Sequence, residues 1–261
     1  TEAIIHHGSG TINDNRFTGI KDNSGSYWNE GTAIAVDSTE NVDITNNEFT
    51  EIGMNGILAD YNTGTISGNT YIGKGAGNWV DYFILSEYGS NVSISNNIIS
   101  NNIGVDEDDG FTSAAIAVLD DPDTQATITG NTMTNNTVGV AVVALSGGTT
   151  DPKVIIGAGN LFDGGEYGVD LQTWWGLAYS PNITFVGASI FKGQSEQAIY
   201  INDGVSVGET IDISSVIFKD SGDVTITDSS AIEDLIYHFN DDPNRGLLKW
   251  DYTAPVADLV F

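Results

Sequence analysis

Short alternating runs of apolar and polar residues recur along the chain, and each run leads into a turn rich in asparagine or glycine. One such phrase is NVDITNNEFTEIG (41–53), and related phrases are NVSISNNIISNNIG (91–104) and ATITGNTMTNNTVG (126–139). Apolar side chains at every second position are typical of short β-strands, and the many β-branched residues favour strands over helices. The phrases therefore predict a repeated unit that is built from short strands.

The repeat becomes visible when one apolar residue of each phrase is aligned. These residues are Ile12, Ile44, Ile66, Ile94, Ile128, Ile156, Phe185 and Ile213. A second alternating run follows each phrase, with central residues Ile34, Ile57, Ile84, Ile116, Val140, Val169, Ile199 and Ile226. One such unit cannot bury its own apolar face, but stacked units can, because each strand then pairs with its equivalents above and below.

Successive aligned residues are 22 to 34 positions apart, over about eight units. A stack of coils with such variable length predicts an all-β fold, the right-handed parallel β-helix or solenoid. A β-propeller would need four strands and about 40 to 45 residues in each blade, and a leucine-rich repeat would need leucine ladders and helices. We expect the β-helix to occupy residues 1–228 and a C-terminal cap, a short helix plus a terminal strand, to occupy 229–261.

The segment SSAIEDLIYHFNDDPNRG (229–246) departs from the strand pattern. Its apolar residues at helical spacing are Ile232, Leu235, Ile236 and Phe239. Ser230, followed three residues later by Glu233, forms the pattern of a capping box. We therefore expect a short amphipathic helix here that covers the apolar end of the last coil.

Five asparagines stand three residues after an aligned isoleucine. They are Asn15, Asn47, Asn69, Asn97 and Asn131. In stacked coils these amides would lie one above another, where each can hydrogen-bond to the next and to the backbone of a tight bend. The equivalent positions later in the chain are Gly159, Ala188 and Val216, so we expect the ladder to end at Asn131. A structural role is favoured, because a catalytic asparagine would not be expected in every coil.

These repeated phrases resemble the pectate-lyase-like superfamily of right-handed parallel β-helix repeat proteins, which includes large bacterial surface and extracellular proteins. The resemblance covers nearly the whole chain and implies the fold. It does not imply one function, because the superfamily includes polysaccharide lyases, glycoside hydrolases, mannuronan epimerases, phage tailspikes and non-enzymatic adhesins.

The phrase YGVDLQ (167–172) resembles a Tyr-Gly-Phe-Asp-Pro-His motif of mannuronan epimerases at Tyr167, Gly168 and Asp170. Leu171 and Gln172 stand where that family has its proline and its catalytic histidine. We interpret the phrase as the second strand of one coil.

The charge of the chain limits its partners. Its 36 acidic and 8 basic residues give a formal net charge of −28, and it has no cysteine. Nucleic acid and anionic membranes are therefore poor partners, and no apolar segment is long enough to insert into a membrane. Because the sequence starts inside a strand-like phrase without methionine, we expect a piece of a larger protein. The resemblance to β-helix surface proteins implies that this protein is bacterial and extracellular or on the cell surface.

Inserted loops follow the polar turns of the first, third and fourth coils. They are GIKDNSGSYWNEG (19–31), GKGAGNWVDY (73–82) and GVDEDDGFT (104–112). The second coil lacks such an insertion, so the loops would form raised walls on both sides of a groove. The residues expected to border or line it are Tyr27, Trp28, Trp79, Asp81, Tyr82 and Phe111. Such a surface could bind a polysaccharide or surface glycan; alternatively, the aromatic side chains fold down and anchor their own loops.

A second aromatic segment, TWWGLAYSPN (173–182), lies in a different part of the coil. Its candidate binding residues are Trp174, Trp175 and Tyr179. This segment could form a second glycan-binding patch or an apolar contact with a neighbouring surface protein.

Two acidic clusters could supply oxygen ligands for Ca²⁺, the only metal cofactor that the sequence suggests. The first consists of Asp106, Glu107, Asp108 and Asp109, and the second of Asp120, Asp121 and Asp123. The alternative is that both are solvated acidic loops. His6 and His7 lack partners at the spacing of a zinc site.

Two functions follow from these patterns. The first is a non-catalytic extracellular or cell-surface β-helix domain, a rigid scaffold for adhesion or for glycan or protein binding through its inserted loops. The alternative is a polysaccharide-acting enzyme with a groove over the first four coils. A lyase would use Lys21 or Lys74 near the uronate, and a glycoside hydrolase would use paired carboxylates at suitable separation.

Overall fold

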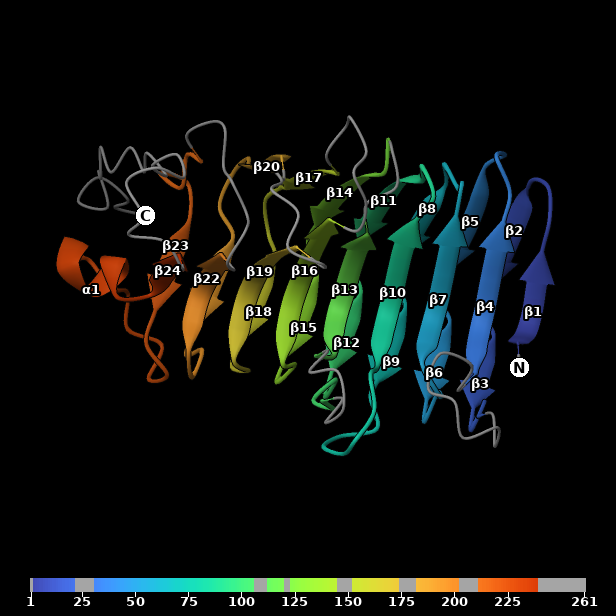
Figure 1. The fold of residues 1–261 in the computed structure, drawn as a ribbon, viewed down its shortest axis with the longest axis horizontal. Coiled ribbons are helices and arrows are strands. Elements are labelled where there is room, and N and C mark those ends of the chain that lie inside the picture. Colours follow the sequence, from blue (N-terminus) through green and yellow to red (C-terminus); the bar gives the residue numbers. More distant parts are fainter. Residues whose placement is uncertain are drawn as a thin grey trace.

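The computed structural model describes residues 2–21, 31–105, 112–119, 123–144, 152–173, 182–201 and 211–238. Over these residues the chain winds into a parallel β-helix of about eight coils, and the described strands form three sheets of nine, seven and eight strands. Figure 1 shows the strands stacked along the long axis, with β1 at one end and the helix α1 at the other. The predicted fold class is confirmed.

The nine-stranded sheet is called sheet A. Its strands, in spatial order, are β1 (Glu2–His6), β4 (Thr32–Asp37), β7 (Asn55–Asp60), β10 (Tyr82–Glu87), β13 (Ala114–Leu119), β16 (Val138–Ala144), β19 (Tyr167–Thr173), β22 (Gln197–Ile201) and β24 (Ile236–His238). Every strand of sheet A pairs in parallel with its neighbours.

The other two sheets complete each coil. Sheet B consists of β2 (Gly10–Asn13), β5 (Val42–Thr45), β8 (Thr65–Ser67), β11 (Asn91–Ser95), β14 (Gln125–Thr129), β17 (Lys153–Ile156) and β20 (Asn182–Phe185). Sheet C consists of β3 (Arg16–Thr18), β6 (Glu48–Thr50), β9 (Thr70–Ile72), β12 (Ile98–Ser100), β15 (Thr132–Thr134), β18 (Leu161–Asp163), β21 (Ile190–Lys192) and β23 (Ile217–Lys219). Most coils run through sheets A, B and C in that order.

The aligned apolar residues form the inside of the solenoid, as predicted. In sheet B, Ile44 pairs with Ile12 on one side and with Ile66 on the other. In sheet A, Ile57 lies between Ile34 and Ile84 in the same way. All of these residues belong to one buried apolar cluster that runs through the stack. Burial of stacked apolar side chains is the main stabilising force of such a coil.

The interior is packed tightly enough to require glycine at particular positions. A Cβ atom on Gly56 of β7 would lie 2.6 Å from Cδ2 of Phe83 and 2.8 Å from the Phe83 carbonyl oxygen. The Phe83 ring in turn stacks on Tyr71 with ring centroids 4.9 Å apart. Any side chain at position 56 would therefore displace both the neighbouring strand and its aromatic packing.

The predicted asparagine ladder is present at the corner between sheets B and C, and it is longer than predicted. Asn131 Nδ2 donates to Asn160 Oδ1 (3.1 Å), and Asn160 Nδ2 donates to Ser189 Oγ (3.2 Å). Asn160 lies directly before β18, as Asn131 lies before β15. The turn from Ile156 to Asn160 contains one more residue than the earlier turns, so a fixed spacing of three selects Gly159 and misses the asparagine.

The C-terminal end contains the predicted short helix, but not all of the segment 229–246 is helical. The helix α1 contains only Ser229–Glu233, and its N-terminal cap is Asp228, whose Oδ1 accepts from Ser230 N (2.9 Å) and Ala231 N (3.1 Å). The predicted Ser230 capping box is therefore wrong. Asp228, two residues before Ser230, satisfies two of the free backbone donors of the helix instead.

The strand that closes sheet A was also placed wrongly. Ile236 pairs with Ile199 and so occupies the sheet A position that was assigned to Ile226. Ile236 was assigned to a helix because its spacing from Ile232 fits a helical face. Pairing with an open sheet edge supplies backbone hydrogen bonds that outweigh this local pattern. Phe239 lies outside the described residues.

Candidate functional site

The loop 73–81, one wall of the predicted groove, is anchored by its own tryptophan. Trp79 Nε1 donates to the Gly75 carbonyl oxygen (3.2 Å), and a Cβ on Gly104 would lie 2.4 Å from Trp79 Cδ1. Lys74 Nζ lies 4.8 Å from the centre of the indole ring, within the range of a cation–π interaction. Trp79 is half-buried. Its contacts agree with the alternative in which the aromatic side chain holds the loop down.

Asp81 and Tyr82 are both buried. Asp81 Oδ1 accepts from Tyr71 Oη, its Oδ2 accepts from Lys74 N (3.1 Å), and Asp81 N donates to Ser113 Oγ (2.9 Å). Burial, together with the Asp81 charge, raises the pKa of Tyr71 well above its usual value. Asp81 thus fastens the loop to sheet C and to the next coil, because a buried carboxylate needs donors on both oxygens.

Several candidate residues lie outside the described residues. They are Tyr27, Trp28, Asp106, Glu107, Asp108, Asp109, Phe111, Asp120, Asp121, Trp174, Trp175 and Tyr179. Asp123 is described, and it is an exposed turn residue with φ of 82°. Within the described ranges, no three His, Cys, Asp or Glu side chains are arranged to hold a metal ion. Those ranges also contain no helix of the length and apolarity that a membrane crossing requires.

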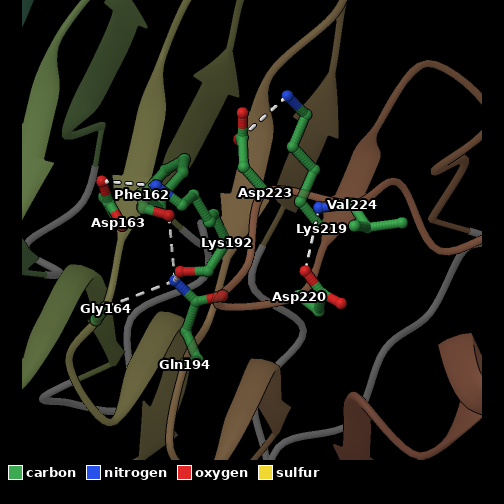
Figure 2. Close-up of polar contacts among 9 residues, drawn as sticks. All are labelled: Phe162, Asp163, Gly164, Lys192, Gln194, Lys219, Asp220, Asp223 and Val224. Atoms are coloured by element: carbon green, nitrogen blue, oxygen red, sulfur yellow. Dashed lines mark hydrogen bonds and ion pairs between the residues drawn. The ribbon is translucent and has the colours of Figure 1, made fainter.

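Several of the few basic side chains take part in structural ion pairs. Lys21 Nζ lies 3.4 Å from Glu51 Oε2 on the surface. Figure 2 shows a similar arrangement beside sheet C, where Lys192 Nζ lies 3.2 Å from Asp163 Oδ2 and Lys219 Nζ lies 3.1 Å from Asp223 Oδ1. The Lys21–Glu51 and Lys192–Asp163 pairs join neighbouring coils, whereas Lys219 and Asp223 lie four residues apart in one coil. Ion pairs near the surface add little stability, but they occupy the lysine side chains.

A second apolar cluster lies on the outer face of sheet A. It consists of Met54, Val80, Tyr82, Leu85, Ala114, Ala117, Leu119, Val138, Ala141 and Val143, with Leu58 and Tyr167 partly buried against it. Leu85 and Ala117 are neighbours in register on β10 and β13. Ala117 lies between the core residues Ile116 and Val118, and Leu85 follows the core residue Ile84. These outward side chains are nevertheless buried, so the middle of this face is shielded from water, and polar groups within it are desolvated.

Asp170 of β19 lies on this shielded face. Its side chain is 3% exposed, and Oδ1 has no hydrogen-bond partner, whereas Gln172 Nε2 donates to Oδ2. Burial raises the pKa of Asp170 to about 7, although the Gln172 hydrogen bond opposes the shift. Asp170 is therefore a protonatable carboxyl group with one free oxygen at neutral pH.

Tyrosine hydroxyls lie close to this carboxyl group. Burial and then the Asp170 charge raise the pKa of Tyr82, and burial with several nearby charges, Asp170 included, raises the pKa of Tyr167 to about 12. Tyr200 is the neighbour of Asp170 in register on β22, and its ring centre lies 4.9 Å from that of Tyr167. An acid of raised pKa beside tyrosines is typical of sites that transfer protons, although ion-pair networks can also shift pKa values.

The sequence contained only a weak sign of this arrangement. YGVDLQ forms β19, as the strand interpretation predicted. Asp170 follows Val169 and precedes Leu171, both of which belong to the core. An aspartate at an outward position of a strand normally faces solvent, so its burial depends on neighbouring coils that the local pattern does not reveal.

Three acidic residues lie side by side at the end of sheet A, before the turn to sheet B. Asp60 lies in register between Asp37 on β4 and Glu87 on β10. Burial and then the Asp37 charge raise the pKa of Asp60 to about 6. These side chains repel one another when ionised, so the row stores unfavourable electrostatic energy at neutral pH.

Comparison with known proteins agrees with the architecture. The family model described as "right handed beta helix region" matches residues 3–155. No curated protein matches the chain, and no solved structure does. The family match covers more than half of the chain and agrees with its three parallel sheets, so this chain belongs to the right-handed β-helix family.

Proposed function

We propose that this domain is a non-catalytic scaffold of an extracellular or cell-surface bacterial protein. It would hold inserted loops at fixed positions along a rigid rod, for adhesion to a glycan or to a neighbouring surface protein. The observation that carries this proposal is the unbroken parallel pairing of sheet A from β1 to β24. Such pairing, with an amide ladder that is buried from Asn47 to Asn160 at one corner, favours a stiff element whose surface loops are free to vary.

The described part of the predicted groove supports a scaffold role. Trp79, Asp81 and Lys74 direct their side chains at their own loop or at the adjacent coil. Binding would then fall to other loops, and the aromatic segment around Trp174 and Trp175 is the first choice. Calcium bound by the acidic clusters would stabilise such loops, because Ca²⁺ takes six to eight oxygen ligands.

Two variants test this division of roles. Binding of the full chain to an array of polysaccharides is measured with and without Ca²⁺, and Trp174→Ala/Trp175→Ala is compared with Trp79→Ala. We expect the double variant to lose glycan binding at least tenfold with an unchanged melting temperature, and Trp79→Ala to lower the melting temperature. Glycan binding by the double variant that equals the wild type would refute the assignment of binding to this segment.

A second candidate function, a polysaccharide-acting enzyme, is favoured by one observation. Asp170 combines a raised pKa, a free oxygen and neighbouring tyrosines, which suits general acid–base chemistry on a sugar. The site would lie on sheet A near β19 rather than over the first four coils. Turnover of a polysaccharide panel distinguishes the two functions: an enzyme should lose roughly 100-fold or more in rate on Asp170→Asn, whereas a scaffold shows no turnover in either form.

A further inference from the structure

The outer face of sheet B differs in charge from the rest of the chain. In β8, β11, β14 and β17, outward side chains alternate with residues of the buried core. Serine and threonine fill most of the outward positions, and Asn91, Gln125, Lys153 and Ile155 fill the others. None of these outward residues is acidic, although the chain contains 36 aspartate and glutamate residues. These outward residues are called the sheet B face.

Lys153 is the one positive charge on the sheet B face, and its ammonium group has no partner among the described residues. The other basic side chains of the described ranges all have one. Arg16, Lys21, Lys192 and Lys219 each lie beside a carboxylate, and Lys74 lies over the Trp79 ring. Lys153 also projects from an exposed position on β17. Among the described residues, it is therefore the basic group that is available to a ligand.

A hollow lies on this face beside Lys153. Its volume is about 160 Å³, and its lining residues come from β11, β14, β17 and β20. They include Asn91, Gln125, Thr127, Lys153, Ile155 and Thr184. The amides and hydroxyls can donate and accept hydrogen bonds, and the lysine adds a full positive charge. Because no described lining residue is negatively charged, the hollow favours an anionic group.

The sheet B face is also suited to being covered by another protein. Its short uncharged side chains lose little conformational entropy on burial, and they carry no charge that must lose its hydration. Apolar contact is available at Ile155, which is 41% exposed, and at Val186, which directly follows β20 and is 55% exposed. The cores of protein–protein interfaces are likewise depleted of charged residues and enriched in apolar ones.

We propose that the sheet B face is an interaction surface for a protein partner whose own contact face is uncharged apart from one aspartate or glutamate. The carboxylate of that residue enters the hollow and accepts a charge-assisted hydrogen bond from Lys153 Nζ. Gln125 and Thr127 donate further hydrogen bonds to the same carboxylate, and Ile155 packs against the aliphatic part of the entering side chain. This surface is separate from the inserted loops, so the contact adds to any binding through them.

Other occupants fit the hollow less well. Sites for cofactors and drug-sized ligands usually enclose roughly 300 to 1,000 Å³ and are mostly apolar, whereas this hollow is smaller and most of the residues named above are polar. A sugar would lack an aromatic ring to stack on, because none is present among the described lining residues. A second copy of the chain carries the same net charge of −28, so the two copies repel each other. One acidic side chain of another protein meets all of these conditions.

A small capped amino acid can test the hollow directly on the full chain. The probe is N-acetylglutamate N-methylamide, whose only charge is its side-chain carboxylate, and its control is the glutamine equivalent. In nitrogen–proton NMR spectra, the amide chemical shifts of Gln125, Lys153 and Thr184 should change and should saturate at millimolar probe. The glutamine compound should bind at least about tenfold more weakly, because it cannot form the charge-assisted hydrogen bond.

Three variants distinguish binding in this hollow from general attraction between charges. Lys153→Gln should weaken binding of the glutamate probe at least about tenfold. Gln125→Glu should have the same effect without removing the lysine, because position 125 is in register with Lys153 and the new carboxylate can pair with it. Lys219→Gln makes the same change in charge at an ion-paired lysine, and it should leave binding unchanged.

The surface is refuted if the shifts do not saturate, if the glutamine compound or the Lys153→Gln protein binds equally well, or if Lys219→Gln weakens binding as much as Lys153→Gln does. Methyl glucuronide, a sugar with one carboxylate, is measured alongside. If it binds as tightly as the glutamate probe or more tightly, the assignment to a protein partner is overturned. Self-association of the chain that is lost in Lys153→Gln, as measured by sedimentation equilibrium, would identify a second copy as the occupant and would overturn it too. Because the probe is not a glycan, the test does not depend on glycan binding by the inserted loops.

Discussion

Two buried polar side chains in this solenoid, Asn97 and Asp170, are treated in opposite ways. Asn97 lies in the ladder, where its Oδ1 accepts from Asn69 N and Nδ2 and its Nδ2 donates to the Ile66 carbonyl oxygen and to Asn131 Oδ1. Asp170 lies on the shielded face of sheet A with one oxygen paired and the other free. The first residue is neutral and satisfied, and the second is ionisable and only half satisfied.

The comparison distinguishes buried polar groups that stabilise the fold from buried polar groups that are candidates for function. A buried group with every hydrogen bond made stabilises the corner and fixes the register of the coils. A buried carboxyl group with a free oxygen costs stability when ionised, so the fold gains nothing from Asp170 at neutral pH. A residue that destabilises its own fold is a better candidate for function than one that supports it.

The largest change in the free energy of unfolding should come from removing the fully hydrogen-bonded side chain of Asn97. Asn97→Ala leaves Asn69 N, Asn69 Nδ2 and the Ile66 carbonyl oxygen without their partner. At roughly 1 to 3 kcal/mol for each buried group left unpaired, we expect a loss of about 3 to 5 kcal/mol in the free energy of unfolding. Urea denaturation followed by circular dichroism measures it.

Asn15→Ala is the matched control, because it removes the same side chain from the exposed end of the ladder. Its loss should be about 1 kcal/mol, since solvent can replace the broken hydrogen bonds. Equal losses for the two variants would show that burial of the ladder adds nothing, and the contrast with Asp170 would then lose its basis.

The regular part of this molecule could be predicted from its sequence, because each coil repeats the same physical requirement. Alternating residues such as Val42 and Ile44 can only be buried by stacking, and Asn47 recurs because the bend recurs. The ladder was predicted to end at Asn131, one rung too early, because the turn before Asn160 contains one more residue. Ile236 was misassigned because a spacing of four fits a helix, whereas the sheet edge beside it is a tertiary feature.

The candidate site was harder to predict, because burial on an outer face depends on the whole stack. Asp81 and Tyr82 looked like groove residues by their position in a polar loop, yet Tyr71 and Ser113 from other elements enclose Asp81. Asp170 looked like an ordinary outward strand residue. Its pKa depends on neighbouring coils that a linear pattern does not contain.

The second-largest effect should come from replacing Asp170, the buried group with a free oxygen. This replacement should raise the free energy of unfolding, whereas Asn97→Ala should lower it. The folded-state pKa of Asp170, about 7, lies above its ordinary value of 3.8, so folding is favoured by protonation. That stability is fully present below about pH 4 and is lost as pH rises to about 7. Asp170→Asn should therefore raise the free energy of unfolding at pH 8 by about 2 to 4 kcal/mol and leave it nearly unchanged at pH 4.

The measurement is denaturant unfolding of both proteins at half-unit steps between pH 4 and 8. Gln172→Leu provides a control, since it removes the hydrogen bond that favours the ionised form, so the loss of stability should continue to higher pH. If the difference in the free energy of unfolding between wild type and Asp170→Asn does not change with pH, Asp170 is ionised over the whole range. The two buried residues would then not differ in the way proposed.

The smallest effect should come from Asp60, which is less buried than Asp170 and therefore lies between the two extremes. Its pKa is raised to about 6, first by burial and then by the Asp37 charge. Stability from the protonated form is present below about pH 4 and lost as pH rises through 6, so Asp60→Asn should stabilise the protein above pH 6. After discounting for solvent screening of this partly exposed group, the gain should be about 1 kcal/mol.

Asp37→Asn tests the cause of the raised Asp60 pKa. It should lower that pKa by less than the full shift, because the burial of Asp60 remains. Carbon NMR of the carboxyl groups measures the pKa. If Asp37→Asn restored the ordinary pKa of Asp60 completely, the raised pKa would be caused by repulsion from Asp37 and not by burial. Asp60 would then not be comparable with Asp170, whose pKa is raised by burial.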